Sequence, residues 1–196
     1  SIFHVAFTQE SNGVSKISRS AFMKRYIYSF ILALWLNYGL PVSHSAPIAD
    51  VNLEYHVKAA FIYNFIAFTY WPESTNQIIQ LCIYGENYFG NEIEKLQNKS
   101  INKRPINVIH ANELDQLKQC QAVFFSKSLS PHHLSNALES LSNQPILTLA
   151  DTATAISQGV TINMNLINDK IVFEVNLAIA RKSGLDISSK LLQLAT

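Results

Sequence analysis

Residues 54–72 read Glu54-Tyr55-His56-Val57-Lys58-Ala59-Ala60-Phe61-Ile62-Tyr63-Asn64-Phe65-Ile66-Ala67-Phe68-Thr69-Tyr70-Trp71-Pro72. Apolar side chains recur every three or four positions, which predicts an amphipathic helix that covers one face of a hydrophobic core. The stripe expected to face the core is Leu53, Val57, Ala60, Phe61, Asn64, Phe65 and Phe68. Glu54 and Lys58 are four residues apart, so we expect this acid–base pair on a face that meets water. Pro72 ends the helix, because the residue before a proline is driven out of the helical region.

Four aromatic side chains of this stretch lie outside the predicted stripe. They are Tyr55, Tyr63, Tyr70 and Trp71. Tyrosine and tryptophan combine a large apolar area with a polar group, which suits protein interfaces. We therefore consider the four as candidate partner-binding residues. The alternative is that their rings cover the edge of the core.

The chain after this helix alternates between short apolar runs and helical patterns. We expect strands at 78–84, 105–109, 121–125 and 145–149. Helices are expected at 92–96, from a Ser130-Pro131 cap to Leu141, and from a cap at Asp151 or Thr152 to Gly159. This alternation predicts an α/β fold with a mostly parallel sheet that is flanked by helices on both faces.

The C-terminal part has a different pattern. Two strand-like runs, 160–167 and 170–175, flank Asn168-Asp169, a two-residue loop of residue types that tolerate positive φ. This predicts an antiparallel hairpin added to the parallel sheet. Helices are then expected at 176–182 and 188–194. Without a repeat or a low-complexity linker, residues 47–196 are expected to form a single domain.

The first 46 residues carry the pattern of a secretory signal peptide. Met23-Lys24-Arg25 is positively charged, Tyr26 to Leu40 is an apolar run of about 15 residues, and Ser43 to Ala46 are mostly small. The run is shorter than the roughly 20 residues that span a bilayer, which favours cleavage over anchoring. Cleavage after Ser45 or after Ala46 remains open. Residues 1–22 fit no targeting pattern, and we favour a natural start at Met23; with a longer start, the apolar run could remain as an anchor.

Charge argues against nucleic acid as a partner. The whole chain has a formal net charge of +1, but residues 47–196 hold eleven Lys/Arg and thirteen Asp/Glu. The excess of positive charge therefore precedes the folded domain, and no basic field remains to attract phosphates.

The interpretation of the two cysteines, Cys82 and Cys120, depends on whether the protein is exported. An oxidising compartment allows two thiols to form a disulfide, whereas the alternative is a pair of buried, unbridged thiols. A metal site built from them is poorly supported, since no histidine or third cysteine stands at ligand spacing.

No set of residues indicates catalysis. The loop from Gly85 to Gly90 lacks the lysine of a phosphate loop and the third glycine of a dinucleotide site. His132 and His133 are adjacent on the expected helix and point in different directions, unlike a zinc-binding i, i+4 pair. We therefore expect a non-enzymatic protein with no cofactor and no metal.

Over residues 53–195 the sequence resembles the YfiR-like periplasmic proteins. The matching segments are Val57-Lys58-Ala59-Ala60-Phe61-Ile62-Tyr63-Asn64-Phe65, Trp71-Pro72, Cys82-Ile83-Tyr84-Gly85, Phe89-Gly90, Cys120, Val123-Phe124-Phe125-Ser126, Leu147-Thr148-Leu149-Ala150-Asp151, Phe173-Glu174-Val175-Asn176 and Gly184-Leu185-Asp186-Ile187-Ser188-Ser189-Lys190-Leu191-Leu192. Their order and spacing together carry the resemblance.

The resemblance implies a periplasmic, non-catalytic repressor that binds the sensor domain of an inner-membrane diguanylate cyclase and lowers cyclic di-GMP. It also implies a disulfide between Cys82 and Cys120, and release of the repressor by an outer-membrane OmpA-like lipoprotein. A second disulfide that some members carry has no matching cysteines in this sequence. A homodimer is left open. The other function considered is a periplasmic small-ligand-binding or transport-accessory protein, because doubly wound sheets offer a crevice at their strand ends.

Overall fold

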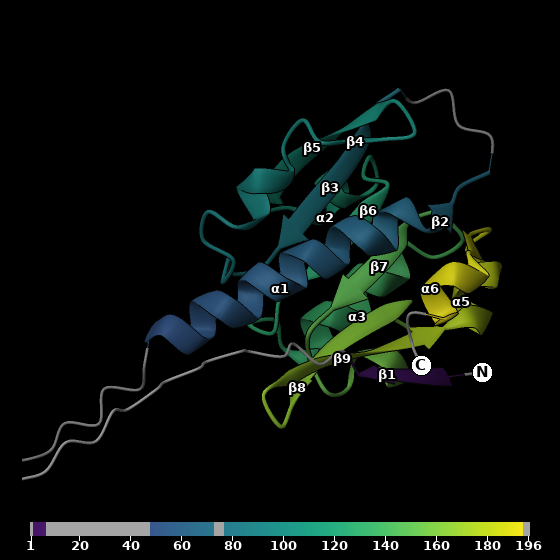
Figure 1. Cartoon of the computed structure of the whole chain (residues 1–196). Coiled ribbons are helices and arrows are strands. Elements are labelled where there is room, and N and C mark those ends of the chain that lie inside the picture. The colour runs from purple at the N-terminus through teal and green to yellow at the C-terminus, as the bar shows by residue number, and fades with distance from the viewer. Residues whose placement is uncertain (1, 7–47, 73–76, 194–196) are drawn as a thin grey trace, which may run out of the picture.

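The fold was analysed in a computed structural model, which describes residues 2–6, 48–72 and 77–193. The described strands form an eight-stranded sheet in the order β1-β9-β8-β7-β6-β3-β5-β4 (Figure 1). Their bounds are β1 Ile2–Ala6, β3 Ile79–Tyr84, β4 Ser100–Ile101, β5 Arg104–Ala111, β6 Ala122–Phe125, β7 Leu147–Ala150, β8 Ile162–Ile167 and β9 Lys170–Asn176. The central strands β5, β3, β6, β7 and β8 are parallel, and β4, β9 and β1 are antiparallel to their neighbours. The predicted α/β class, with its mostly parallel sheet and C-terminal hairpin, is confirmed.

The chain reverses its direction of winding beside β3. From β3 it moves to β5 on one side, and then returns to β6, β7 and β8 on the other side. Adjacent loops therefore leave the carboxyl ends of β3 and β6 toward opposite faces. This switch point is where doubly wound sheets place their binding crevices.

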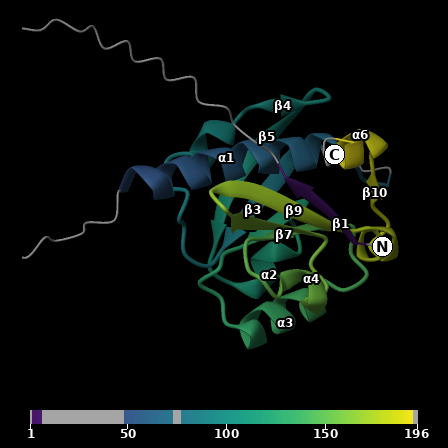
Figure 2. The ribbon, with the colours of Figure 1, turned by 60° about the horizontal axis from the view of Figure 1, so that its bottom comes forward.

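Helices cover both faces of the sheet, as predicted (Figures 1 and 2). One face carries α1, with α5, α6 and a small two-stranded sheet of β2 and β10 at one end. The opposite face carries α2, α3 and α4. The bounds of these elements, together with the 3₁₀ helix η1, are α1 Ile48–Ala67, β2 Thr69–Tyr70, η1 Ile93–Leu96, α2 Leu114–Leu117, α3 Pro131–Ser140, α4 Ala155–Gln158, α5 Leu177–Lys182, β10 Asp186–Ile187 and α6 Ser189–Gln193.

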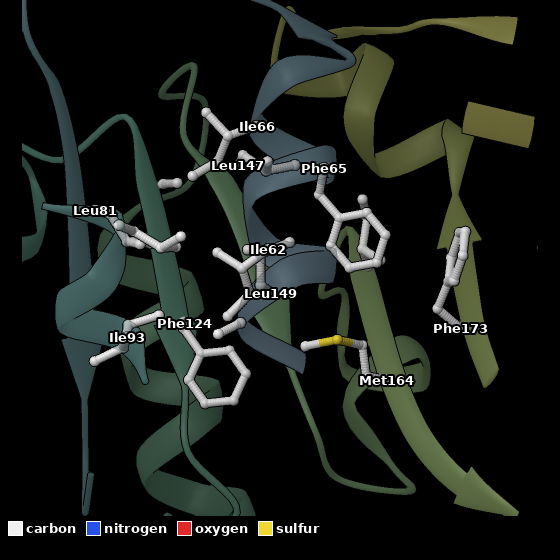
Figure 3. Packing of buried hydrophobic residues seen from close by; sticks show 14 of the residues in the cluster. Ile62, Phe65, Ile66, Leu81, Ile93, Phe124, Leu147, Leu149, Met164 and Phe173 are labelled. Atoms are coloured by element: carbon white, nitrogen blue, oxygen red, sulfur yellow. The ribbon is translucent and has the colours of Figure 1, made fainter. Parts of the chain in front are cut away.

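The larger core lies between α1 and the sheet. Ile62, Phe65 and Ile66 of α1 point at strand residues such as Leu149 and Phe173 (Figure 3). The rings of Phe65 and Phe173 meet edge to face with centroids 4.8 Å apart, a favourable arrangement for aromatic pairs. Burial of these side chains is the main force that holds α1 on the sheet.

The stripe predicted for α1 was partly right, because Phe65 is buried and Val57, Phe61 and Phe68 pack against the core. Its buried face is formed by Tyr55, Lys58, Ala59, Ile62, Phe65 and Ile66. Leu53, which was expected to face the core, is 53% exposed. Helix α1 has 20 residues and is apolar around much of its circumference. The 3.6-residue period of its sequence therefore allowed more than one buried face. Contacts with the sheet select the face that is used.

The helix also ends earlier than Pro72 suggested. It stops at Ala67, and the next residues form β2, which pairs antiparallel with β10. The Thr69 hydroxyl donates a hydrogen bond of 2.7 Å to the Phe65 carbonyl at this end. A short strand therefore occupies residues that were read as the last turn of the helix.

Local signals predicted several element ends correctly. Asn168 and Asp169 have φ of 49° and 60° in the hairpin loop, and the Ser130 side chain caps α3 by accepting from the His133 amide. The cap predicted at Asp151 or Thr152 was wrong, because α4 begins after Thr154. Asp151 instead accepts hydrogen bonds from α1 and from the loop after β6.

A disulfide joins Cys82 in the middle of β3 to Cys120, just before β6. The two Cα atoms are 6.0 Å apart, and both residues are buried in the core beneath α2, α3 and α4. The pairing that the family resemblance implied is present. It fastens two neighbouring parallel strands on the face opposite α1.

The expected signal peptide lies outside the described residues. In the part of the chain that the structure describes, no helix has the length and apolar character needed to cross a membrane. Residues 2–6, which precede the signal-peptide pattern, form β1, and β1 pairs with the outer edge of β9.

Candidate functional site at the carboxyl end of the sheet

The candidate site lies where β3, β6 and β7 end. Strand β3 leads into Gly85, β6 into Ser126 and β7 into Asp151, all at the same end because these strands are parallel. The first half of α1 reaches this end, since the Tyr55 hydroxyl contacts Asp151. Three loops and one helix thus meet beside the switch point of the sheet.

Asp151 is the centre of a buried polar network. Its Oδ2 accepts hydrogen bonds from the Lys58 ammonium and from the Tyr55 hydroxyl, each at 2.8 Å. Its Oδ1 accepts from the Lys127 amide at 2.9 Å. The carboxylate is 0% exposed, and a buried charge is tolerated only with partners of this kind.

Lys58 corrects an expectation from the sequence. It does pair with Glu54, at 2.5 Å, but its side chain is only 2% exposed and also contacts Asp151. The i, i+4 spacing identified one partner and missed the other, which lies 93 residues away in the chain. Two carboxylates offset the desolvation of this ammonium, so the lysine belongs to the buried face of α1.

The Tyr55 hydroxyl is held in its neutral form. Burial, and then the negative charge of Asp151, raises the pKa of Tyr55 far above its ordinary value of 10.0. A neutral phenol is the form that donates to the Asp151 carboxylate. The network is therefore a fixed structural link between α1 and β7, with its donors and acceptors already paired.

An exposed polar surface lies over this network. The Lys127 ammonium is 5.3 Å from the Tyr55 ring centroid and 5.0 Å from that of Tyr88. Tyr88 is 37% exposed, and a hydrogen bond with Glu86 raises its pKa. Lysine between two rings gains cation–π attraction while its charge remains available to solvent.

Close packing fixes the loop that carries Glu86 and Tyr88. Gly85 has φ of +97°, and a Cβ added there would lie 2.8 Å from the Ser128 hydroxyl oxygen. The same hydroxyl accepts a hydrogen bond of 2.9 Å from the Glu86 amide. The glycine thus allows the loops after β3 and β6 to approach each other.

Exposed apolar side chains occur at this same end of the sheet. They are Val51 and Leu53 at the start of α1, Tyr88 after β3, and Leu166 and Ile167 at the end of β8. Their exposures range from 37% to 53%. Figure 1 shows the first turns of α1 and the tip of the β8–β9 hairpin projecting on this side of the molecule. We call these five residues the carboxyl-end apolar group.

The four aromatic residues proposed from the sequence do not form one surface. Tyr55 is 1% exposed and belongs to the core, whereas Tyr70 is 54% exposed. Tyr63 is half-buried and donates to the Ser100 carbonyl at 3.3 Å. Trp71 is half-buried and donates to the Gln121 carbonyl, at the amino end of β6. Tyr55 and Trp71 therefore lie at opposite ends of the sheet, and only Tyr70 presents most of its ring to solvent.

The histidines form local contacts. His56 contacts Glu92 at 2.5 Å and His110 contacts Glu94 at 2.6 Å, all near the surface. The His133 ring lies 2.9 Å from the Ser130 hydroxyl, which already caps α3. Among the described residues, no three His, Cys, Asp or Glu side chains are grouped as metal ligands would be.

A cavity of about 340 Å³ lies away from this site, between α3, α4 and α5. Its lining includes Leu138, Glu139, Gln158, Ile179 and Lys182. Gln158 donates to the Thr154 hydroxyl at 3.1 Å, while its buried Oε1 has no hydrogen-bond partner. The lining of this cavity is mixed apolar and polar.

Comparisons with solved structures and with family models both gave matches. A solved structure of O-acetylhomoserine sulfhydrylase from the methionine biosynthetic pathway of Wolinella succinogenes is similar with a TM-score of 0.37 and 10% identity. The similarity covers 60% of this chain and 39% of that chain, so this chain spans about two fifths of its length. A family model described as YfiR/HmsC-like matches residues 55–196. That match includes the whole sheet after β2, the disulfide and Asp151, and the chain therefore belongs to the YfiR/HmsC-like family.

Proposed function

We propose that the chain is an exported, non-catalytic regulator that binds the periplasmic sensor domain of an inner-membrane diguanylate cyclase and holds the enzyme inactive. Family membership supports a regulatory role of this kind. The signal-peptide pattern before residue 47 supports export, and an oxidising compartment suits the Cys82–Cys120 disulfide. An OmpA-like outer-membrane lipoprotein is proposed as the competitor that releases the cyclase.

The observation that carries the proposal is the carboxyl-end apolar group above a buried, fully paired network. Several exposed apolar side chains at one end of a protein suit contact with a partner. The network below them is rigid, because Asp151 accepts three hydrogen bonds. A rigid surface with exposed apolar and aromatic side chains suits binding of a folded partner.

The test is recovery of a diguanylate cyclase from membranes with the tagged, exported protein. Cyclase activity in the eluate is measured as conversion of GTP to cyclic di-GMP. We expect Leu53→Ser and Tyr88→Ser to lower recovery at least tenfold, about 1.4 kcal/mol in binding free energy. Ile78→Ser is the matched control, since Ile78 is 47% exposed at the amino end of β3.

The variant Tyr70→Ser distinguishes the two ends of the molecule. Tyr70 is the most exposed of the four aromatic residues first proposed as partner contacts. Loss of recovery with Tyr70→Ser but not with Tyr88→Ser would move the interface to the amino end. Recovery of no cyclase with the unaltered protein would refute the proposed partner.

A small-ligand or transport-accessory role is the second candidate, and the cavity beside Gln158 favours it. A ligand that binds only the native state raises the melting temperature. A screen of amino acids and nucleotides by thermal shift tests this role. A rise that Gln158→Ala abolishes would support it, and no rise with any compound would remove it.

A further inference from the structure

The amino end of the sheet brings exposed apolar and positively charged side chains together. The parallel strands begin at this end, and β2 and the β4–β5 hairpin lie here, opposite the first turns of α1 (Figure 1). The Trp71 indole donates to the Gln121 carbonyl just before β6, and Ile78 immediately precedes β3. We call the following six residues the amino-end surface: Tyr70, Trp71, Ile78, Lys99, Lys103 and Arg104.

The apolar part of the amino-end surface has the residue types of a membrane interface. Tyr70 is 54% exposed and Ile78 is 47% exposed. Trp71 is half-buried, and its hydrogen bond of 3.2 Å to Gln121 fixes the indole at this end. Tyrosine and tryptophan are enriched at the level of lipid headgroups, because their rings are apolar and carry one polar group. These side chains could therefore enter the headgroup region of a bilayer.

The β4–β5 hairpin carries the positive part of this surface. Its turn is formed by Asn102 and Lys103, with φ of 51° and 67°, so Lys103 is exposed at the tip. Lys99 is also exposed, with its ammonium 5.7 Å from the Tyr63 ring centroid. Residues 97–112, all of which the structure describes, include Lys99, Lys103 and Arg104 but no Asp or Glu. The hairpin therefore presents cations without local counter-charges.

Helices α5 and α6 add cations on the other side of β2. Their exposed basic residues are Arg181, Lys182 and Lys190, whereas the described residues 177–193 contain a single acid, Asp186. Residues 47–196 hold eleven Lys/Arg and thirteen Asp/Glu, so the net charge conceals this segregation. The expectation that no basic field remains in the domain is corrected for this end of the molecule.

Arg104 lacks an acceptor for its guanidinium group. Its Nε and Nη2 atoms are buried and have no hydrogen-bond partner. Buried donors without an acceptor are unfavourable. The Nε–H and an Nη–H of arginine can bind two oxygens of one phosphate. Because these two donors make no hydrogen bond in their present position, rotation of the side chain toward a phosphate would not break one.

We propose that the amino-end surface binds the anionic phospholipid headgroups of the periplasmic leaflet of the inner membrane. The step rests on the proposed function, since export brings the domain to this leaflet. Lysine and arginine pair with lipid phosphates while the exposed rings enter the headgroup region. A bilayer is broad enough to contact the hairpin and the α5–α6 cations together, which lie on opposite sides of β2. The carboxyl-end apolar group faces away from the bilayer and stays free for the sensor domain.

Trp71 provides a direct test of lipid contact. The chain has two tryptophans, Trp35 and Trp71, so Trp35→Phe leaves Trp71 as the single fluorophore whether or not the apolar run is removed. Protein recovered from the periplasm is mixed with vesicles of equal parts phosphatidylcholine and phosphatidylglycerol that carry bromine on their acyl chains. We expect these vesicles to quench Trp71 fluorescence, and high salt to reverse the quenching. Vesicles of brominated phosphatidylcholine alone should leave the fluorescence unchanged.

Charge variants test which end of the molecule binds. A basic residue near an anionic bilayer contributes about fivefold in affinity, so Lys103→Gln should weaken vesicle binding by that factor in co-sedimentation. Lys99→Gln combined with Lys103→Gln should weaken it about twenty-fivefold. Lys170→Gln is the matched control, because Lys170 is exposed at the start of β9, at the carboxyl end of the parallel strands. Circular dichroism confirms that each variant is folded.

The outcomes separate this inference from the proposed function. Mass spectrometry of the recovered chain reports whether residues 1–46 are gone, which tests export alone. Processed protein that ignores anionic vesicles, or that loses as much affinity with Lys170→Gln as with Lys103→Gln, would overturn the membrane surface while leaving the regulator intact. In a chain that keeps residues 1–46, Trp71 quenching unaffected by Lys99→Gln with Lys103→Gln would equally overturn it. Vesicle binding without any recovered cyclase would refute only the proposed partner.

Discussion

At the scale of single residues, Lys58 and Asp151 show how a contact distant in sequence changes a local interpretation. Glu54 and Lys58 have the spacing of an exposed helical ion pair, and this pair does form. Burial of Lys58 depends on Asp151, which looked like a helix cap. Nothing in the spacing of residues 54–58 indicates that β7 ends beside α1. The centre of the candidate site could therefore not be predicted from the sequence.

We predict that Lys58→Met lowers the free energy of unfolding by about 3–5 kcal/mol, because it leaves a buried carboxylate without its cation. Urea denaturation of the purified protein measures the change. Lys58→Met combined with Asp151→Asn should recover part of the loss. Lys190→Met, at an exposed residue, is the control. A loss below about 1 kcal/mol for Lys58→Met would contradict the paired network.

Tyr55→Phe should remove part of the alkaline sensitivity of the fold. The folded protein holds the Tyr55 proton more tightly than the unfolded chain, because burial and Asp151 raise its pKa above 10.0. This stabilisation is fully present below pH 10 and is lost as pH rises further, by about 1.4 kcal/mol per pH unit. The variant should lack that slope in urea titrations between about pH 10 and 11.5.

At neutral pH, Tyr55→Phe should lower the free energy of unfolding by about 1.5–3 kcal/mol, the usual contribution of a hydrogen bond to a charged group. Tyr70→Phe, at an exposed ring, is the matched control for loss of a phenol. An unchanged alkaline slope in Tyr55→Phe would show that the phenol does not interact with Asp151 as the 2.8 Å contact indicates.

At the scale of elements, prediction succeeded where local chemistry specifies the backbone. The Asn168-Asp169 loop and the Ser130-Pro131 cap were recognised because their residue types favour those conformations directly. Strands β2 and β10 were missed, since two residues carry no periodicity. The buried face of α1 was predicted only in part, because the sheet selects which side of the helix is fully buried and no helical pattern describes that choice.

Gly85→Ala and Gly90→Ala should differ in stability although both glycines have positive φ. An alanine at either position meets the cost of a left-handed backbone, roughly 1–2 kcal/mol. At Gly85 the added Cβ also approaches the Ser128 hydroxyl oxygen to 2.8 Å, whereas at Gly90 it meets nothing within 4 Å. We expect Gly85→Ala to be the less stable variant in urea. Equal losses would show that the loops after β3 and β6 separate easily.

At the scale of the whole molecule, the alternation of strands and helices was sufficient to predict the layers, because each element repeats its own period. The position of the proposed binding surface was not predictable in the same way. Tyr55 and Tyr70 have the same side chain and occur in one stretch, yet one is buried and the other exposed. Tyr55 lies in α1 against the sheet and Tyr70 lies in the short strand β2, so their exposure depends on tertiary position.

The disulfide should contribute to global stability. It closes a loop with a sequence separation of 38 residues, worth about 4 kcal/mol on the chain-entropy model. We expect Cys82→Ala combined with Cys120→Ala to lower the free energy of unfolding by up to this amount. The same double variant should be insensitive to dithiothreitol, which should destabilise the unaltered protein. Equal stability with and without reductant in the unaltered protein would contradict this role.

Cellular cyclic di-GMP tests the regulatory account most directly. It is measured in cells lacking the gene, in cells given back the full chain, and in cells given a chain whose apolar run carries Leu34→Arg and Leu36→Arg to block export. We predict that deletion raises cyclic di-GMP, that the full chain restores the original level, and that the export-blocked chain does not. An unchanged level on deletion, or full restoration by the export-blocked chain, would contradict an exported restraint on a membrane cyclase.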